Sequence, residues 1–142
     1  MASVTLEQAS KIIDEGLAFA RKQNFKPLCM VVLDDAGHTK AMKREDGAGI
    51  LRADVALGKA WSTLGMNAPS SRALGQRLQD RPSFLAAIGL LAEGKVVPVA
   101  GGVAIYQGDE VIGAVGISGA SSDEDEECAL AGIQAAGLTA RT

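Results

Sequence analysis

The stretch "GGVAIYQGDEVIGAVGISGASSDEDEE", residues 101–127, decides the fold. A short turn joins two apolar runs, 95–107 and 111–118, and this pattern predicts an antiparallel hairpin. Five consecutive acids and an apolar helical pattern follow it. Ser121 stands three residues before Glu124, the spacing of a capping box, and acids in a first turn suit the helix dipole. The stretch therefore predicts a hairpin that leads into a well-capped helix.

Working outward, the rest of the chain alternates between helical and strand-like patterns. Apolar residues at helical spacing predict helices over 6–23, 50–66 and 83–94, and short apolar or alternating runs predict strands over 28–35 and 39–45. The stretch "SSRALGQRLQ" (70–79) is compatible with one more short helix. The predicted order is α-β-β-α-α-β-β-α. Hairpins pair antiparallel, so we expect one α+β domain over 1–142, a sheet covered by helices.

Composition excludes several classes of function. The net charge is −3 and aromatic residues make up 4% of the 142 residues, so no basic, aromatic surface for nucleic acid is expected. The first residues lack the pattern of a signal peptide, and no apolar run reaches about 18 residues, so we expect a cytoplasmic protein without a membrane span. Cys29 and Cys128 lie far apart, which indicates neither a disulfide framework nor a zinc site.

Four side chains stand out as candidates for chemistry. His38, the only histidine, lies in a hairpin turn and is either a solvated turn residue or an acid/base group or ligand. Arg44 and Asp46 belong to the charged cluster "KREDG", which is either a solvated strand end or a clamp for a carboxylate. Lys59 lies in a predicted helix, where a surface position competes with a role in binding.

Glycines gather where the predicted strands end. Gly101 and Gly102 interrupt the apolar run 95–107, and Gly116, Ser118 and Gly119 lie at the end of the run 111–118. A strand end with bare backbone beside a helix N-terminus exposes amide groups that suit an anion. The acids that follow would repel an anion, so they must point away if the site binds one.

The segments "VVLDDAGHTKAMKREDGA", "ALGKAWS" and "VAGGVAIYQGDEVIGAVGISGASSDEDEECALAG" together resemble the GlcG/HbpS family, which includes the C-terminal module of PduO-type proteins. The resemblance covers roughly residues 5–138. It implies a profilin-like antiparallel sheet of about five strands with helices packed on it, homo-oligomers from dimers to octamers, and in some members haem binding.

The family resemblance also implies an axial histidine in the first helix, but the helix predicted over 6–23 contains none. An axial ligand would have to come from His38, Met42, Met66, Tyr106 or an oxygen donor. The family's "GGVPI" also reads "GGVAI" here, with Ala104 in place of proline.

Two functions of different classes follow. The first is a small-ligand-binding module for haem or a related tetrapyrrole, with Arg44, Lys59 and the glycine strand ends near the propionates. The second is an isomerase, hydratase or lyase for a carbonyl or carboxylate compound. In it, His38 is the acid/base group, Arg44 clamps the substrate, and Asp46 or Glu124 orients the histidine. A structural oligomer without a ligand is the third reading.

Overall fold

The computed structural model describes residues 2–142. The nine helices and strands of these residues alternate in the order helix, hairpin, three helices, hairpin, helix. Their bounds are α1 Leu6–Lys22, β1 Cys29–Asp34, β2 Thr39–Arg44, α2 Leu51–Gly65, α3 Ser71–Leu78, α4 Pro82–Leu91, β3 Gly102–Gln107, β4 Glu110–Ser118 and α5 Ser122–Ala135. The predicted order is confirmed except that three helices, not two, separate the hairpins.

The sheet is antiparallel with strand order β2-β1-β4-β3. The α+β class is confirmed, but the expected five strands are four within the described residues. The free edge of β3 is occupied instead by isolated bridges from Val103 to Ser70 and from Tyr106 to Thr139. These single pairings cover the edge without forming a fifth strand.

The strand predicted over 95–107 is too long, because β3 begins only at Gly102. Pro98 has no N–H to donate to a ladder. Side chains of neighbouring helices bind the backbone of this segment: the Ser62 hydroxyl bonds the Val97 amide at 2.7 Å and the Ser71 hydroxyl bonds the Val99 carbonyl at 2.6 Å. The segment 95–101 is therefore a connector fixed to α2 and α3.

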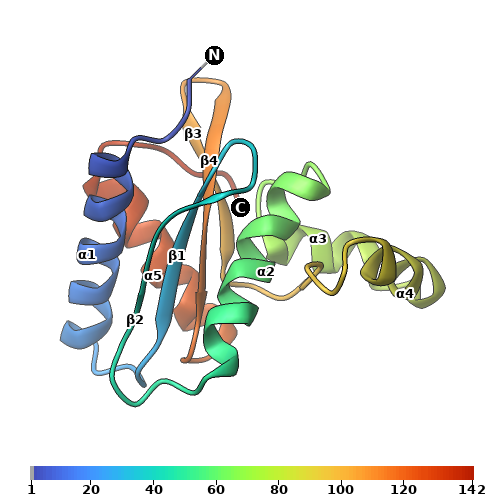
Figure 1. Ribbon diagram of the computed structural model, residues 1–142, viewed down its shortest axis with the longest axis horizontal. Helices are drawn as coiled ribbons and strands as arrows, with labels where there is room; N and C mark the ends of the chain where they lie inside the picture. Colours follow the sequence, from blue (N-terminus) through green and yellow to red (C-terminus); the bar gives the residue numbers. More distant parts are fainter. Residues whose placement is uncertain (1) are drawn as a thin grey trace.

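Helices cover both faces of the sheet (Figure 1). Helices α1 and α5 pack together on one face, where Met30 and Val32 of β1 join the largest core cluster. Helix α2 lies on the other face, against Val31 and Leu33 of the same strand. The period-two alternation of a strand places these neighbours on opposite faces, so the continuous apolar run of β1 is explained by burial on both.

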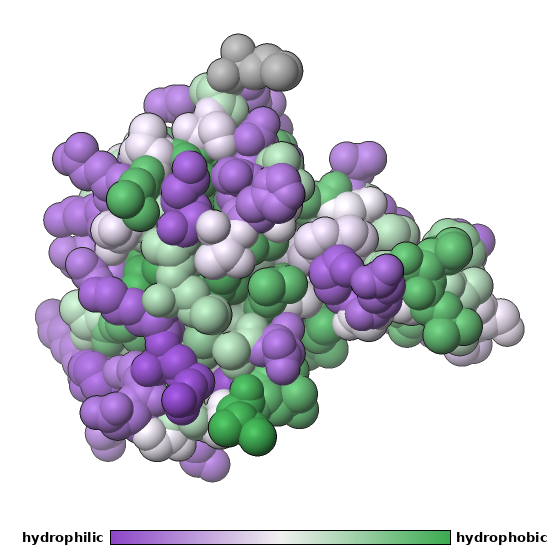
Figure 2. Space-filling view, in the orientation of Figure 1, coloured by the Kyte–Doolittle hydropathy of each residue, from purple (hydrophilic) through white to green (hydrophobic). Residues whose placement is uncertain are grey.

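Helix α4 projects away from the sheet (Figure 1). None of its residues is buried, and Leu90 and Leu91 are 83% and 84% exposed. Figure 2 shows the resulting apolar surface on the projecting arm. Among residues 2–142, no helix has the length and apolar character needed to cross a membrane.

Candidate functional site

The first acids of α5 are occupied by contacts within the chain. The Ser121 hydroxyl accepts from the Glu124 amide at 3.2 Å, and the Ser121 amide donates to Glu124 Oε1 at 3.1 Å, so the predicted capping box is confirmed. The Ala120 amide donates to Asp125 Oδ1 at 3.0 Å. The Ala120 and Ser121 amides are thus bound by carboxylates of the same chain and are not presented to an anion.

Lys59 lies inside the protein, not on its surface. Its Nζ donates to the Ile117 carbonyl at 3.0 Å and to Asp125 Oδ2 at 3.1 Å, and the two charged side chains are 5% and 2% exposed. Burial raises the pKa of Asp125, and the charge of Lys59 opposes this shift. A ligand could reach the ammonium only if this pair were broken.

Two further acids of α5 bind Arg72 of α3. The Arg72 Nε lies 3.1 Å from Glu126 Oε1, and its Nη2 bonds Asp123. The acid run is therefore divided among a cap, a buried lysine and an arginine from another helix. The sequence shows the acids, but only the fold shows which basic residues face them.

Glycines at the strand ends are required by close packing. A Cβ on Gly101 would lie 2.8 Å from Cδ of Lys59, and one on Gly102 would collide with the Lys59 carbonyl. Gly116 faces the Ala56 carbonyl of α2, and Gly119 faces the backbone at Pro27. Ser118 is also engaged, since its hydroxyl accepts from Arg52 Nη1 at 3.2 Å. Packing explains these predicted binding residues without a ligand.

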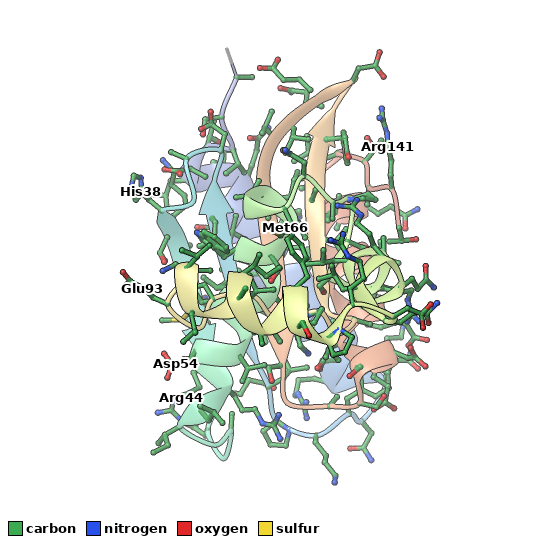
Figure 3. All side chains as sticks on the ribbon, turned by 90° about the vertical axis from the view of Figure 1, so that its right-hand side faces the viewer. His38, Arg44, Asp54, Met66, Glu93 and Arg141 are labelled. Atoms are coloured by element: carbon green, nitrogen blue, oxygen red, sulfur yellow. The ribbon has the colours of Figure 1, made fainter. Side chains whose placement is uncertain are left out.

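His38 and Arg44 lie at opposite ends of β2 (Figure 3). Five residues lie between them, and six steps along an extended strand put their backbones about 20 Å apart. The His38 side chain is 82% exposed, with Nδ1 3.9 Å from Asp34 Oδ1. Glu124 lines another cleft beside Gly119, so within one chain the residues of the enzyme hypothesis do not converge.

Arg44 and Asp46 do come together, in a cleft of about 420 Å³ between α1 and the end of β2. Arg21 and Lys43 also line this cleft. Arg21 Nε lies 2.9 Å from Glu45 Oε2, and Lys43 Nζ lies 2.8 Å from Asp14 Oδ1. Arg44 instead donates to the Ala48 carbonyl at 2.8 Å, and among residues 2–142 it forms no salt bridge with a carboxylate. Lys43 belongs to the predicted charged cluster, but sequence reasoning missed Arg21, because α1 and β2 meet only in the fold.

Three exposed apolar side chains are close in sequence to the residues that line this cleft. Ile50 is 89% exposed, Leu51 is 65% exposed and Met42 is 47% exposed. Figure 2 shows apolar surface next to strongly hydrophilic surface where α2 begins. We call Arg21, Lys43, Arg44 and these three apolar residues the basic end. It combines one arginine that has no carboxylate partner within the described residues, Arg44, with uncovered apolar surface.

The sheet and the helices on both of its faces define a small α+β module with a charged cleft at one end. A family model described as "Haem degrading protein HbpS-like" matches residues 4–134. The chain belongs to this HbpS-like family.

Three comparisons illustrate the relationship. The chain is 30% identical over 125 residues to an uncharacterised 15.0 kDa protein in the dhaT-dhaS intergenic region of Citrobacter freundii, covering 88% of this chain and 86% of the relative. A Streptomyces reticuli HbpS double mutant superposes with a TM-score of 0.80 at 30% identity, covering 94% and 87% of the two chains. A PduOC–haem complex has a TM-score of 0.87 at 23% identity, covering 99% and 100%, a likeness of fold.

Proposed function

We propose that this protein is a binding module for haem or a related tetrapyrrole, and that the ligand binds at the basic end. The family description names haem, and the chain matches that family over 4–134. A haem presents a flat apolar ring and two propionates, so its site needs apolar contact area together with cations. The basic end offers both on adjoining elements.

The unneutralised guanidinium of Arg44 is the observation that carries the proposal. A charged group that already has a carboxylate partner gains little from a second one, whereas Arg44 holds only a carbonyl. Its planar fork matches a carboxylate bidentately. Lys43 and Arg21 line the same cleft, but each already binds a carboxylate, Asp14 and Glu45 respectively, so the proposal rests on Arg44.

In this proposal Met42 would hold the haem iron through its thioether sulfur. Lys43 bonds Asp14 of α1, so the alternation of β2 places Met42 and Arg44 on the face that looks away from α1. Helix α2 packs over β1, β4 and β3, and Met42 remains 47% exposed. A thioether is an established haem ligand. Of the other candidates, His38 lies at the far end of β2, and Met66 and Tyr106 line other cavities.

The test is a haem titration followed by absorbance. We expect a saturable Soret band in the wild type, affinity at least about tenfold weaker in Arg44→Ala, and an altered band in Met42→Leu. Arg77→Ala is the matched control for Arg44, because Arg77 is an exposed arginine that also donates to a carbonyl, that of Met66, at 3.0 Å. Met66→Leu is the control for Met42. No Soret change at micromolar haem, or equal effects of Arg77→Ala and Arg44→Ala, would contradict the proposal.

A homo-oligomer is part of the same proposal. The family resemblance implies one, and helix α4 carries apolar side chains that its own chain does not cover, including Phe84 at 37% exposure. Light scattering of the wild type and of Leu90→Asp/Leu91→Asp tests it. We expect the variant to have a smaller mass; an unchanged mass would place the interface elsewhere, and a monomeric wild type would refute the oligomer.

A further inference from the structure

A second cleft lies at the end of the sheet remote from the basic end. It has a volume of about 590 Å³, within the usual range for a small-molecule site. The C-terminal half of α2 and the loop to α3 form one wall, and the β3–β4 hairpin forms the other. Leu64, Ala68 and Val111 are among its apolar lining residues.

The walls of this cleft are held by hydrogen bonds. The Ala104 amide donates to the Pro69 carbonyl at 3.0 Å and joins the loop to the edge of β3. The Ala68 amide donates to the Thr63 carbonyl at 2.9 Å and closes the turn after α2. Asn67, which also lines the cleft, has a φ of 50° in the left-handed region. The cleft is thus preformed by the backbone.

The C-terminal segment places a guanidinium at the rim. The Tyr106 amide donates to the Thr139 carbonyl at 2.9 Å, and the Thr139 amide returns a bond to the Tyr106 carbonyl at 3.1 Å. This pairing brings Arg141 Cζ to 4.2 Å from the centre of the Tyr106 ring, a cation–π contact that orients the guanidinium. Arg141 Nη2 also lies 2.8 Å from Asp109 Oδ1. Both side chains are exposed, so this ion pair is weak and the carboxylate of a ligand can replace Asp109.

The charges around the cleft limit what it can bind. Arg141 can receive one carboxylate, and the apolar walls can cover a hydrocarbon body. Asp35 and Glu110 also line the cleft and oppose negative charge, so a ligand can place at most one carboxylate there, against Arg141. We propose that this cleft is a binding site for a small monocarboxylate with an apolar or aromatic body, separate from the basic end.

Saturation-transfer NMR with 3-phenylpropionate as the probe tests this inference, and 3-phenylpropanol is the neutral comparison. We expect the carboxylate to bind in the millimolar range or tighter, the alcohol to bind at least about tenfold more weakly, and Arg141→Ala to remove the difference. Arg81→Ala is the matched control. Its guanidinium lies over Phe84 at the same 4.2 Å but lines none of the described cavities.

Three results would overturn the inference. The first is no saturation transfer to 3-phenylpropionate at roughly 10 millimolar, about the weakest useful affinity. The others are equal binding of 3-phenylpropionate and 3-phenylpropanol, or an equal loss of 3-phenylpropionate binding in Arg141→Ala and Arg81→Ala. A haem titration of Arg141→Ala separates the two sites. We expect its Soret titration to match that of the wild type, so failure at one site leaves the other testable.

Discussion

Replacing Lys59 by methionine should destabilise the protein strongly. Methionine keeps most of the aliphatic side chain that packs against Gly101, but it removes the ammonium and leaves the Asp125 carboxylate buried at 2% exposure. An unpaired buried charge of this kind costs about 3–5 kcal/mol. With a urea m-value of about 2 kcal/mol/M, the unfolding midpoint should fall by about 1.5–2.5 M.

The double variant separates the ion pair from the packing. Asp125→Asn keeps an oxygen that can accept from the Ala120 amide, a bond of 3.0 Å in the wild type. With both charges removed, we expect Lys59→Met/Asp125→Asn to recover at least about half of the loss, because the buried pair itself contributes little net stability. Urea unfolding followed by Trp61 fluorescence and far-UV circular dichroism measures all four proteins.

A loss of unfolding free energy below about 1 kcal/mol in Lys59→Met would show that the Asp125 carboxylate is solvated or protonated without cost. That result would contradict the burial of this side chain. A double variant no more stable than the weaker single variant would refute the charge argument, because packing would then explain the whole loss. A haem titration unchanged in Asp125→Asn would further place this pair outside the ligand site.

Three other predictions concern acid stability, thiol reactivity and packing. Hydrogen bonds from the His38 and Ala36 amides lower the pKa of Asp34, so Asp34→Ala should be less stable than Asp35→Ala at pH 7. The difference in stability between the two variants should disappear as the pH falls through the pKa of Asp34 in the folded protein, which acid unfolding scans measure. Burial raises the pKa of Cys128 to about 12, so iodoacetamide at pH 8 should label it only after unfolding, and labelling of the native protein would contradict this. Gly116→Ala should cost about 1–3 kcal/mol against the facing α2 carbonyl, whereas Gly89→Ala, with open space at its Cβ, should be neutral or stabilising; thermal unfolding compares the two.

Local signals in the sequence predict much of the fold. The capping box at Ser121 consists of short-range hydrogen bonds, so its residue spacing suffices to place the start of α5. The hairpins follow from apolar runs joined by short turns. The length of β3 is harder to predict, because hydroxyls of Ser62 and Ser71, distant in sequence, hold the segment before it.

The candidate site depends on long-range contacts and is therefore less predictable. Composition alone predicts Lys59 on a helix surface. In the fold, α2 packs closely on Gly116, and the Lys59 ammonium is buried against Asp125. Arg44 and Asp46 are neighbours in sequence and share a cleft. Arg21 joins them only because α1 lies beside the end of β2.

Paramagnetic broadening of backbone amide signals by ferric haem tests the central proposal most directly, because it reports binding and location together. We expect the signals of residues 17–21 and 42–51 to broaden first, and zinc protoporphyrin to shift the same signals without broadening them. Broadening that begins around His38 or at the cleft beside Tyr106 would contradict a site at the basic end. Spectra unchanged by haem would contradict haem binding itself.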